Sequence, residues 1–68
     1  MKPVSGKQMC KTLERHGWQL DRVRGSHHVY KKVGEPGTIP VPVHGNRMLK
    51  PKTQRSIMRT AGLTDDDL

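Results

Sequence analysis

The sequence predicts a small α+β domain with the element order α-β-β-β-α, in which a three-stranded antiparallel sheet carries both helices on one face. Two helix-start signals, one near each end of the chain, flank three short segments of strand character that are separated by glycine-containing turns. The chain has 68 residues, of which 31% are hydrophobic, so it can build one small core. We therefore expect a single domain over residues 1–68, with any substrate bound on an open surface.

The first helix is predicted to begin at Ser5. Ser5 and Gln8 have the spacing of a capping box, in which each side chain accepts a hydrogen bond from an exposed backbone N–H of the other residue. Val4 and Met9 have the spacing of a hydrophobic staple across the same helix start. Gly17 is the residue type favoured just beyond a helix end, so we expect the helix to stop before it.

Three strands are expected next, over about residues 18–24, 27–33 and 38–43. In the first, Trp18 and Leu20 alternate with polar residues, which predicts that they share a buried face. In the third, Ile39, Val41 and Val43 share one face. Prolines occupy the two positions between them, and each proline lacks a backbone N–H. The third strand is therefore expected at an edge of the sheet.

The second helix is predicted to open at Pro51, which suits the first turn of a helix. Its expected apolar stripe consists of Thr53, Ile57, Met58 and Ala61. Gly62 and Leu63 have the pattern of a Schellman-type stop, with Leu63 folding back on the helix. The acidic residues 65–67 are expected to form a last short turn.

The charge of the chain favours a polyanionic partner. Lys and Arg number 13, Asp and Glu number 6, and three of the six acids lie at positions 65–67. Such a positive field attracts nucleic acid first and anionic membrane second. The single Cys10 cannot form an intramolecular disulfide, and no run of apolar residues approaches membrane-spanning length. We therefore expect a cytoplasmic protein that contacts nucleic acid and no membrane.

The chemistry is expected in the segment Arg24–Tyr30. Gly25 and Ser26 predict a tight turn that leads into a strand starting with His27 and His28. Successive strand residues point to opposite faces, so these two imidazoles cannot serve the same site. A lone strand histidine is more often structural than catalytic. RNA, however, supplies its own nucleophile, the 2′-hydroxyl, so one imidazole among cations can act as a general base without a metal.

His44, just after the third strand, is a second candidate, as an acid or as a phosphate ligand; the alternative is a turn histidine bonded to local backbone. No cysteine pair and no carboxylate has ligand spacing to the four histidines, so we expect no metal site and no cofactor. Lys50 and Lys52 flank Pro51 at the predicted helix start, where the helix dipole adds to their attraction for phosphate. They could equally be simple solvent-exposed lysines.

The order α-β-β-β-α resembles the double-stranded-RNA-binding domain, in which the basic start of the second helix meets phosphates. A closer resemblance is carried by six segments in a specific order: residues 2–7, 17–18, 24–28, 41–46, 49–51 and 57–63. On these segments the chain resembles HicA-type (YcfA-like) mRNA interferase toxins of type II toxin–antitoxin systems. The resemblance covers nearly the whole length.

This resemblance implies a dsRBD-like fold, metal-independent cleavage of mRNA that blocks translation, and a HicB-type antitoxin protein that covers the active site. The family's catalytic histidine is the first after Gly-Ser, which matches His27, and Ser26 belongs to the turn that presents it. In the expected mechanism His27 accepts the 2′-hydroxyl proton, and Ser26 and His44 are possible supporting residues. The expected phosphate ligands are Lys50, Lys52, Arg22 and Arg24.

Two other functions remain open at this point. The first is a non-catalytic RNA-binding module with the same basic surface and a structural His27. The second is a protein-interaction subunit whose basic face meets an acidic partner. Binding of RNA without cleavage would favour the RNA-binding module.

Overall fold

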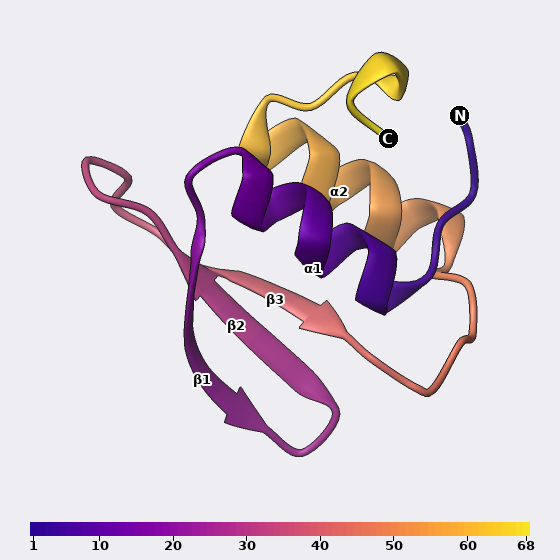
Figure 1. Ribbon diagram of the computed structural model, residues 1–68, viewed down its shortest axis with the longest axis horizontal. Helices are drawn as coiled ribbons and strands as arrows, with labels where there is room; N and C mark the ends of the chain where they lie inside the picture. The colour runs from indigo at the N-terminus through magenta and orange to yellow at the C-terminus, as the bar shows by residue number, and fades with distance from the viewer.

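The computed structural model describes residues 1–68, and its elements follow the predicted order α-β-β-β-α. The elements are α1 (Gly6–Arg15), β1 (Gln19–Arg24), β2 (His27–Lys31), β3 (Ile39–Pro42), α2 (Pro51–Ala61) and a 3₁₀ turn η1 (Asp65–Asp67). The strands form one antiparallel sheet in the order β1-β2-β3 (Figure 1). The predicted architecture is confirmed, and β3 lies at a sheet edge as its prolines predicted.

The start of α1 is fixed by the predicted capping box. The Ser5 N–H donates to Gln8 Oε1 at 2.8 Å, and the Gln8 N–H donates to Ser5 Oγ at 3.1 Å. Val4 and Met9 are both buried, as expected for a hydrophobic staple across the helix start. Gly17, just past the helix, has a φ of 90°, a conformation that glycine adopts without steric cost.

The first turn of α1 also lies directly against the end of β3. A Cβ atom added to Gly6 would lie 2.2 Å from the backbone oxygen of Pro42. No side chain fits in this space, since the obstacle is backbone and cannot rotate away. Gly6 therefore allows the close approach that holds the helix against the sheet edge.

The pairing register assigns each strand residue to one of two faces. His27 lies between Arg24 on β1 and Pro42 on β3, and each next position along β2 alternates sides. A bulge in β1 between Leu20 and Arg22 adds one residue to that strand, so that Arg22 and Arg24 lie on the same face as Gln19. The helix-covered face carries Leu20, Val23, His28, Tyr30, Ile39 and Val41. The opposite face, which we call the bare face, carries Gln19, Arg22, Arg24, His27, Val29, Lys31, Pro40 and Pro42.

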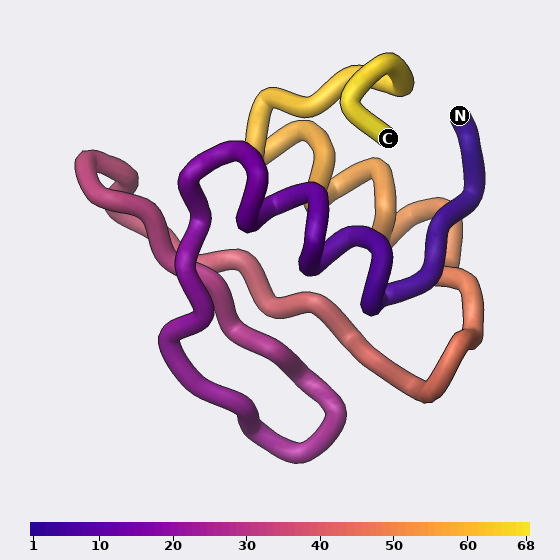
Figure 2. The backbone as a smooth tube through the Cα atoms, in the orientation of Figure 1, coloured from indigo at the N-terminus to yellow at the C-terminus, as the bar shows by residue number.

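Both helices lie on one face of the sheet. Buried side chains of α1 and α2 form a single core cluster with Tyr30, Ile39 and Val41, which all belong to the helix-covered face. No residue of the bare face belongs to this cluster. The β1–β2 hairpin extends away from the helices, as the backbone tube shows (Figure 2).

One buried position of α2 differs from the prediction. Gln54 is 1% exposed, whereas Thr53, which was expected in the core stripe, is only half-buried. The amide of Gln54 has partners in the N-terminal segment: its Oε1 accepts from the Val4 N–H at 3.2 Å, and its Nε2 donates to the Lys2 carbonyl at 2.6 Å. The buried polar group is therefore satisfied, and it ties α2 to the chain start.

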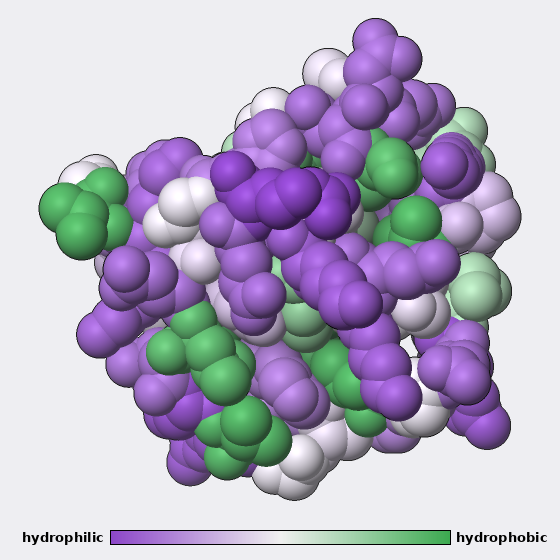
Figure 3. Space-filling model, viewed as in Figure 1, coloured by the Kyte–Doolittle hydropathy of each residue, from purple (hydrophilic) through white to green (hydrophobic).

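The predicted buried face of the first strand is only half correct. Trp18 is 3% exposed, but Leu20 is 46% exposed and Val23 on the same face is 53% exposed. The reason is the position of β1 at an edge of the sheet: Leu20 pairs with Tyr30 on the central strand, which the helices cover, but β1 itself lies to the side of that cover. Apolar surface consequently remains visible over β1 in the space-filling view (Figure 3).

The end of α2 has the predicted Schellman geometry. Gly62 has a φ of 69°, and the Leu63 N–H donates to the Met58 carbonyl at 2.8 Å. Leu63 folds back and is buried. The acidic residues beyond it form η1, with Thr64 and Asp67 in a capping box. The acidic end of the chain thus packs back on the domain, where Asp67 Oδ1 lies 3.6 Å from Nε2 of His16.

Candidate active site

His27 is the first residue of β2 and lies exposed on the bare face. The two-residue turn Gly25-Ser26 precedes it, and Gly25 has a φ of 58° while Ser26 does not have a positive φ. A Gly-X pair of this kind is typical of a type II′ hairpin turn. The Ser26 carbonyl accepts a hydrogen bond from the Val43 N–H at 2.7 Å, which anchors the turn to the end of β3. His27 is therefore presented to solvent from a turn that is held on both sides.

His28 occupies a different environment. It lies on the helix-covered face between Val23 and Val41, and it is half-buried. Its Nδ1 is buried and has no hydrogen-bond partner within the molecule. The two neighbouring imidazoles thus lie on opposite faces of the sheet, as strand alternation predicted, and only His27 is open to a large ligand.

The cations around His27 differ in availability. Asp21, in the β1 bulge, forms ion pairs with Arg22 and with Lys31, whose Nζ lies 3.4 Å from its Oδ1. The hydrogen bond from Arg22 holds the pKa of Asp21 below its usual value, so this carboxylate stays charged and keeps both cations engaged. Arg24, directly across the ladder from His27, takes part in none of the ion pairs of the molecule. Of the two predicted arginines, Arg24 is the one free to hold a phosphate beside His27.

A cleft of about 280 Å³ begins at Pro42, the residue of β3 that pairs with His27. It is lined by Pro42, His44, Arg47, Met48, Leu49, Lys50 and Thr53. Three cationic or titratable side chains, His44, Arg47 and Lys50, therefore surround one cleft that begins at Pro42. The predicted residues His44 and Lys50 are brought together here, whereas Lys52 lines a separate groove on the other side of Thr53.

Arg47 was missed in the sequence, although a signal for it exists. Gly45-Asn46 is a turn-forming pair, and the Arg47 N–H donates to the His44 carbonyl at 3.0 Å across it. Residues at the first and fourth positions of a turn lie close together. Two basic side chains flanking a Gly-Asn pair therefore predict a local cationic cluster.

The start of α2 adds to the positive potential of this cleft. The N-cap residue Lys50 makes no side-chain capping bond, and no acidic residue occurs in the first turn. The exposed N–H groups and the positive end of the helix dipole are consequently available to an anion. The predicted role of this helix start as a phosphate contact is compatible with its position beside the cleft.

The buried titratable groups belong to the core and not to this site. Tyr30 is 1% exposed and donates a hydrogen bond to Glu14 Oε2 at 2.7 Å. Burial raises the pKa of the Tyr30 hydroxyl and that of the Cys10 thiol, so both stay protonated at neutral pH. Neither group is poised as a nucleophile.

The chain contains no cluster of three or more His, Cys, Asp or Glu side chains arranged to hold a metal ion. Neither helix is long and apolar enough to cross a membrane. His27 pairs with Arg24 on β1 and with Pro42 on β3, and Pro42 also borders the basic cleft.

Comparison with known proteins identifies the family. The family model described as the HicA toxin of bacterial toxin-antitoxin systems matches residues 6–63 of the 68-residue chain, a span that runs from the start of α1 past the end of α2. No curated protein matches the chain. The matched span includes the Gly-Ser-His turn, the bare face and the basic cleft. The chain therefore belongs to the HicA family, the toxins of bacterial toxin–antitoxin systems.

Proposed function

We propose that this toxin is a metal-independent endoribonuclease that cleaves mRNA and so blocks translation. The observation that carries the proposal is the position of His27, exposed on the bare face and directly across the ladder from the unpaired Arg24. A neutral imidazole there can act as a base, and the neighbouring guanidinium can hold the phosphate that reacts.

The proposed reaction is a transesterification within the RNA strand. His27 accepts the proton of a 2′-hydroxyl, and the 2′-oxygen forms a bond to the adjacent phosphorus. The bond between phosphorus and the 5′-oxygen breaks, and the 5′-oxygen takes up a proton from water or from His44. The products are a 2′,3′-cyclic phosphate and a 5′-hydroxyl. Cations at Arg24 and Lys50 stabilise the charge that builds up on the phosphoryl oxygens.

Membership of the family implies an antitoxin partner. We propose a HicB-type antitoxin protein that inhibits by covering the bare face around His27. This surface is open and basic, so an acidic protein surface could neutralise it and exclude RNA at the same time.

The direct test is to incubate the purified protein with RNA in the presence of EDTA and to analyse the ends of the fragments. We expect fragments with cyclic or 3′-phosphate and 5′-hydroxyl ends, and no cleavage when the RNA is replaced by DNA of the same sequence. His27→Ala should stop cleavage and growth arrest while the circular dichroism spectrum is unchanged. Binding without any cleavage by the wild-type protein would instead support the non-catalytic RNA-binding module.

A further inference from the structure

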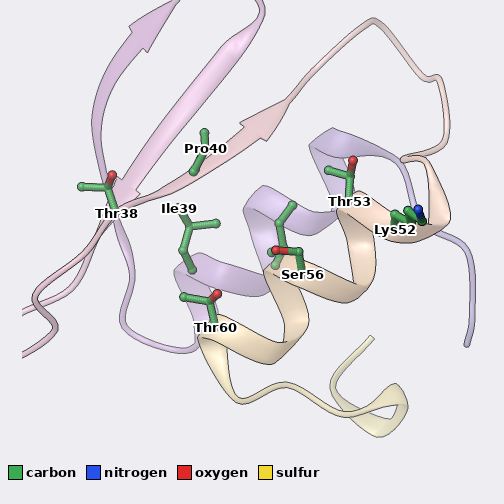
Figure 4. A pocket seen from close by; sticks show the side chains of 8 residues that line it. Thr38, Ile39, Pro40, Lys52, Thr53, Ser56 and Thr60 are labelled. Carbon is green, nitrogen blue, oxygen red and sulfur yellow. The ribbon is translucent and has the colours of Figure 1, made fainter.

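A second groove lies between the outer edge of β3 and α2. Its volume is about 410 Å³. It is lined by Thr38, Ile39 and Pro40 from the strand side and by Lys52, Thr53, Ser56, Ile57 and Thr60 from the helix (Figure 4). Only two of these eight residues are hydrophobic. Such a lining does not suit an apolar ligand or a core helix of a partner.

The hydroxyl groups in this groove are uncommitted. Thr53, Ser56 and Thr60 repeat at helical spacing along one side of α2, and none of them makes a side-chain hydrogen bond within the molecule. Hydroxyls on helices often donate to the carbonyl one turn earlier, as Thr12 does to Gln8 at 3.1 Å. A row of hydroxyls that forgo this bond is available to a ligand.

Within β3, the strand side of the groove presents a carbonyl acceptor and no N–H donor, and the Thr38 hydroxyl lies just before the strand. Val43 donates its N–H to Ser26, so residues of the same parity, including Ile39 and Val41, direct their N–H groups toward β2. The outward positions of the strand are Pro40 and Pro42, which have no N–H. The carbonyl of Pro42 meets α1 at Gly6, which leaves the carbonyl of Pro40 for the groove.

This combination selects against a peptide strand and in favour of a ribonucleotide. A partner strand that extends the sheet needs N–H donors from the edge, and the outward positions of β3, Pro40 and Pro42, have none. A ribonucleotide offers what the groove lacks: phosphate oxygens for Lys52 and the hydroxyls, and 2′-hydroxyl or base amino donors for the Pro40 carbonyl. Small-ligand pockets hold about 300–1,000 Å³, so 410 Å³ is large enough for a single unpaired nucleotide.

We propose that the groove between β3 and α2 binds one nucleotide of single-stranded RNA beside the phosphodiester bond whose cleavage His27 assists, and that it reads the ribose through hydroxyl contacts. This inference rests on the proposed RNA-cleaving function. The groove and the basic cleft share Thr53, so one strand of RNA can occupy both. Pro40 and Pro42 are two residues apart, about 7 Å along the strand, which places the groove next to the position of His27.

The experiment compares RNA affinity in the His27→Ala background, where the RNA stays intact. The groove variant combines Thr53→Val, Ser56→Ala and Thr60→Val, which remove the hydroxyls and keep the shape. Affinity for a short unstructured RNA should fall about tenfold or more, since each lost hydrogen bond contributes about 0.5–1.5 kcal/mol. Affinity for DNA of the same sequence should change less, because DNA has no 2′-hydroxyl.

Unchanged RNA affinity in the folded triple variant would refute nucleotide binding in the groove and leave the proposed cleavage unaffected. Absence of any RNA binding by the His27→Ala protein itself would instead refute the proposed function, and the groove with it. If the triple variant does not fold, NMR titration of the His27→Ala protein decides the matter. Changes in the amide chemical shifts of Thr38, Ser56 and Thr60 on addition of RNA would support binding in the groove. Shift changes elsewhere but at none of these three residues would refute it.

Discussion

The two faces of the sheet differ in the burial and pairing of their polar side chains, and neighbouring residues of β2 show the difference most directly. On the helix-covered face Tyr30 is 1% exposed and hydrogen-bonded, and His28 beside it is half-buried with an unpartnered Nδ1. On the bare face His27 is exposed and Arg24 has no acidic partner. Most of the buried side chains of the sheet lie on the helix-covered face, and the exposed His27 and the unpaired Arg24 lie on the other.

Because of this difference, we expect substitutions to fall into two classes, those that change stability and those that change activity or RNA affinity. A change on the helix-covered side should lower the free energy of unfolding and affect activity only through the amount of folded protein. A change at an exposed residue of the bare face should leave the unfolding transition in place and alter the chemistry or the RNA affinity, whereas Val29 on that face is buried and belongs to the first class. The four predictions below test this separation, beginning with the largest expected effect.

Gly6→Ala should remove the folded state. The added Cβ would lie 2.2 Å from the Pro42 backbone oxygen, so α1 must move away from β3. The loss should exceed about 3 kcal/mol, comparable to the total of about 3–5 kcal/mol expected for a domain of this size. Thermal unfolding followed by circular dichroism measures it.

The matched control is Gly37→Ala. Gly37 has no atom within 4 Å of an added Cβ and no positive φ, so the same substitution should be neutral or stabilise by about 0.4–1 kcal/mol. Equal unfolding temperatures for the two variants would show that the contact between α1 and β3 is not tight.

His27→Leu and His28→Leu should affect the cleavage rate and the stability in opposite ways. His27→Leu removes the proposed base, so cleavage should fall about 10²–10⁴-fold with little change in unfolding temperature. His28→Leu removes a buried, unpartnered nitrogen, so the protein should keep its activity and be equally or more stable. Cleavage rates and melting curves of the two variants provide the comparison. A His28→Leu protein that is folded but inactive would reverse the assignment of the two histidines.

The helix-covered face should also make the protein sensitive to high pH. Burial raises the pKa of Tyr30 above its ordinary value of 10.0, so the folded state keeps this proton while the unfolded state releases it. The stabilisation is therefore complete below pH 10 and is lost as the pH rises further, by up to about 1.4 kcal/mol per pH unit for one proton. Urea titrations at increasing pH should show this decline.

Tyr30→Phe should weaken the alkaline decline, at the expense of the hydrogen bond to Glu14 at neutral pH. The thiol of Cys10, whose pKa is also raised by burial, would account for the sensitivity that persists. A decline that is as steep in the Tyr30→Phe protein as in the wild type would show that the tyrosine proton is not its source.

The smallest effect is expected at the start of α2, which is proposed to contact phosphate. Lys52→Gln should reduce RNA affinity modestly and lower the slope of log affinity against log salt by about 0.7, the value for one phosphate contact on a single strand. Lys7→Gln is the control, because Lys7 occupies the same second position of α1 and carries the same charge. Equal salt slopes for both variants would mean that only the net charge of the domain matters.

Much of the fold could be predicted because its signals are local. The capping box at Ser5, the turn at Gly25 and the stop at Gly62 each depend on hydrogen bonds or backbone angles within a few residues. Strand alternation likewise predicted that His27 and His28 face opposite ways. The burial of Leu20 was predicted wrongly, because alternation gives the face of a residue but not how far a covering helix reaches.

Several of the features that were missed join distant parts of the chain. Gln54 is buried because its amide meets the backbone of Lys2 and Val4, about fifty residues earlier. The basic cleft and the hydroxyl-lined groove exist only where β3 packs beside α2. Asp21 in the bulge of β1 pairs with Arg22 and Lys31, and the expected role of Arg22 as a phosphate ligand stays a prediction.

By itself the sequence determined the order of the helices and strands, the start of α1, the stop after α2 and which residues alternate along β2, because these depend on short-range hydrogen bonding and steric limits. The strand ends were predicted less closely, since β2 ends at Lys31 and not at Val33. Only the tertiary structure decided which face of the sheet is covered, which cations stay free and which side chains share a cleft. These outcomes depend on packing between segments far apart in the chain, where Gly6 meets Pro42 and Gln54 meets the chain start.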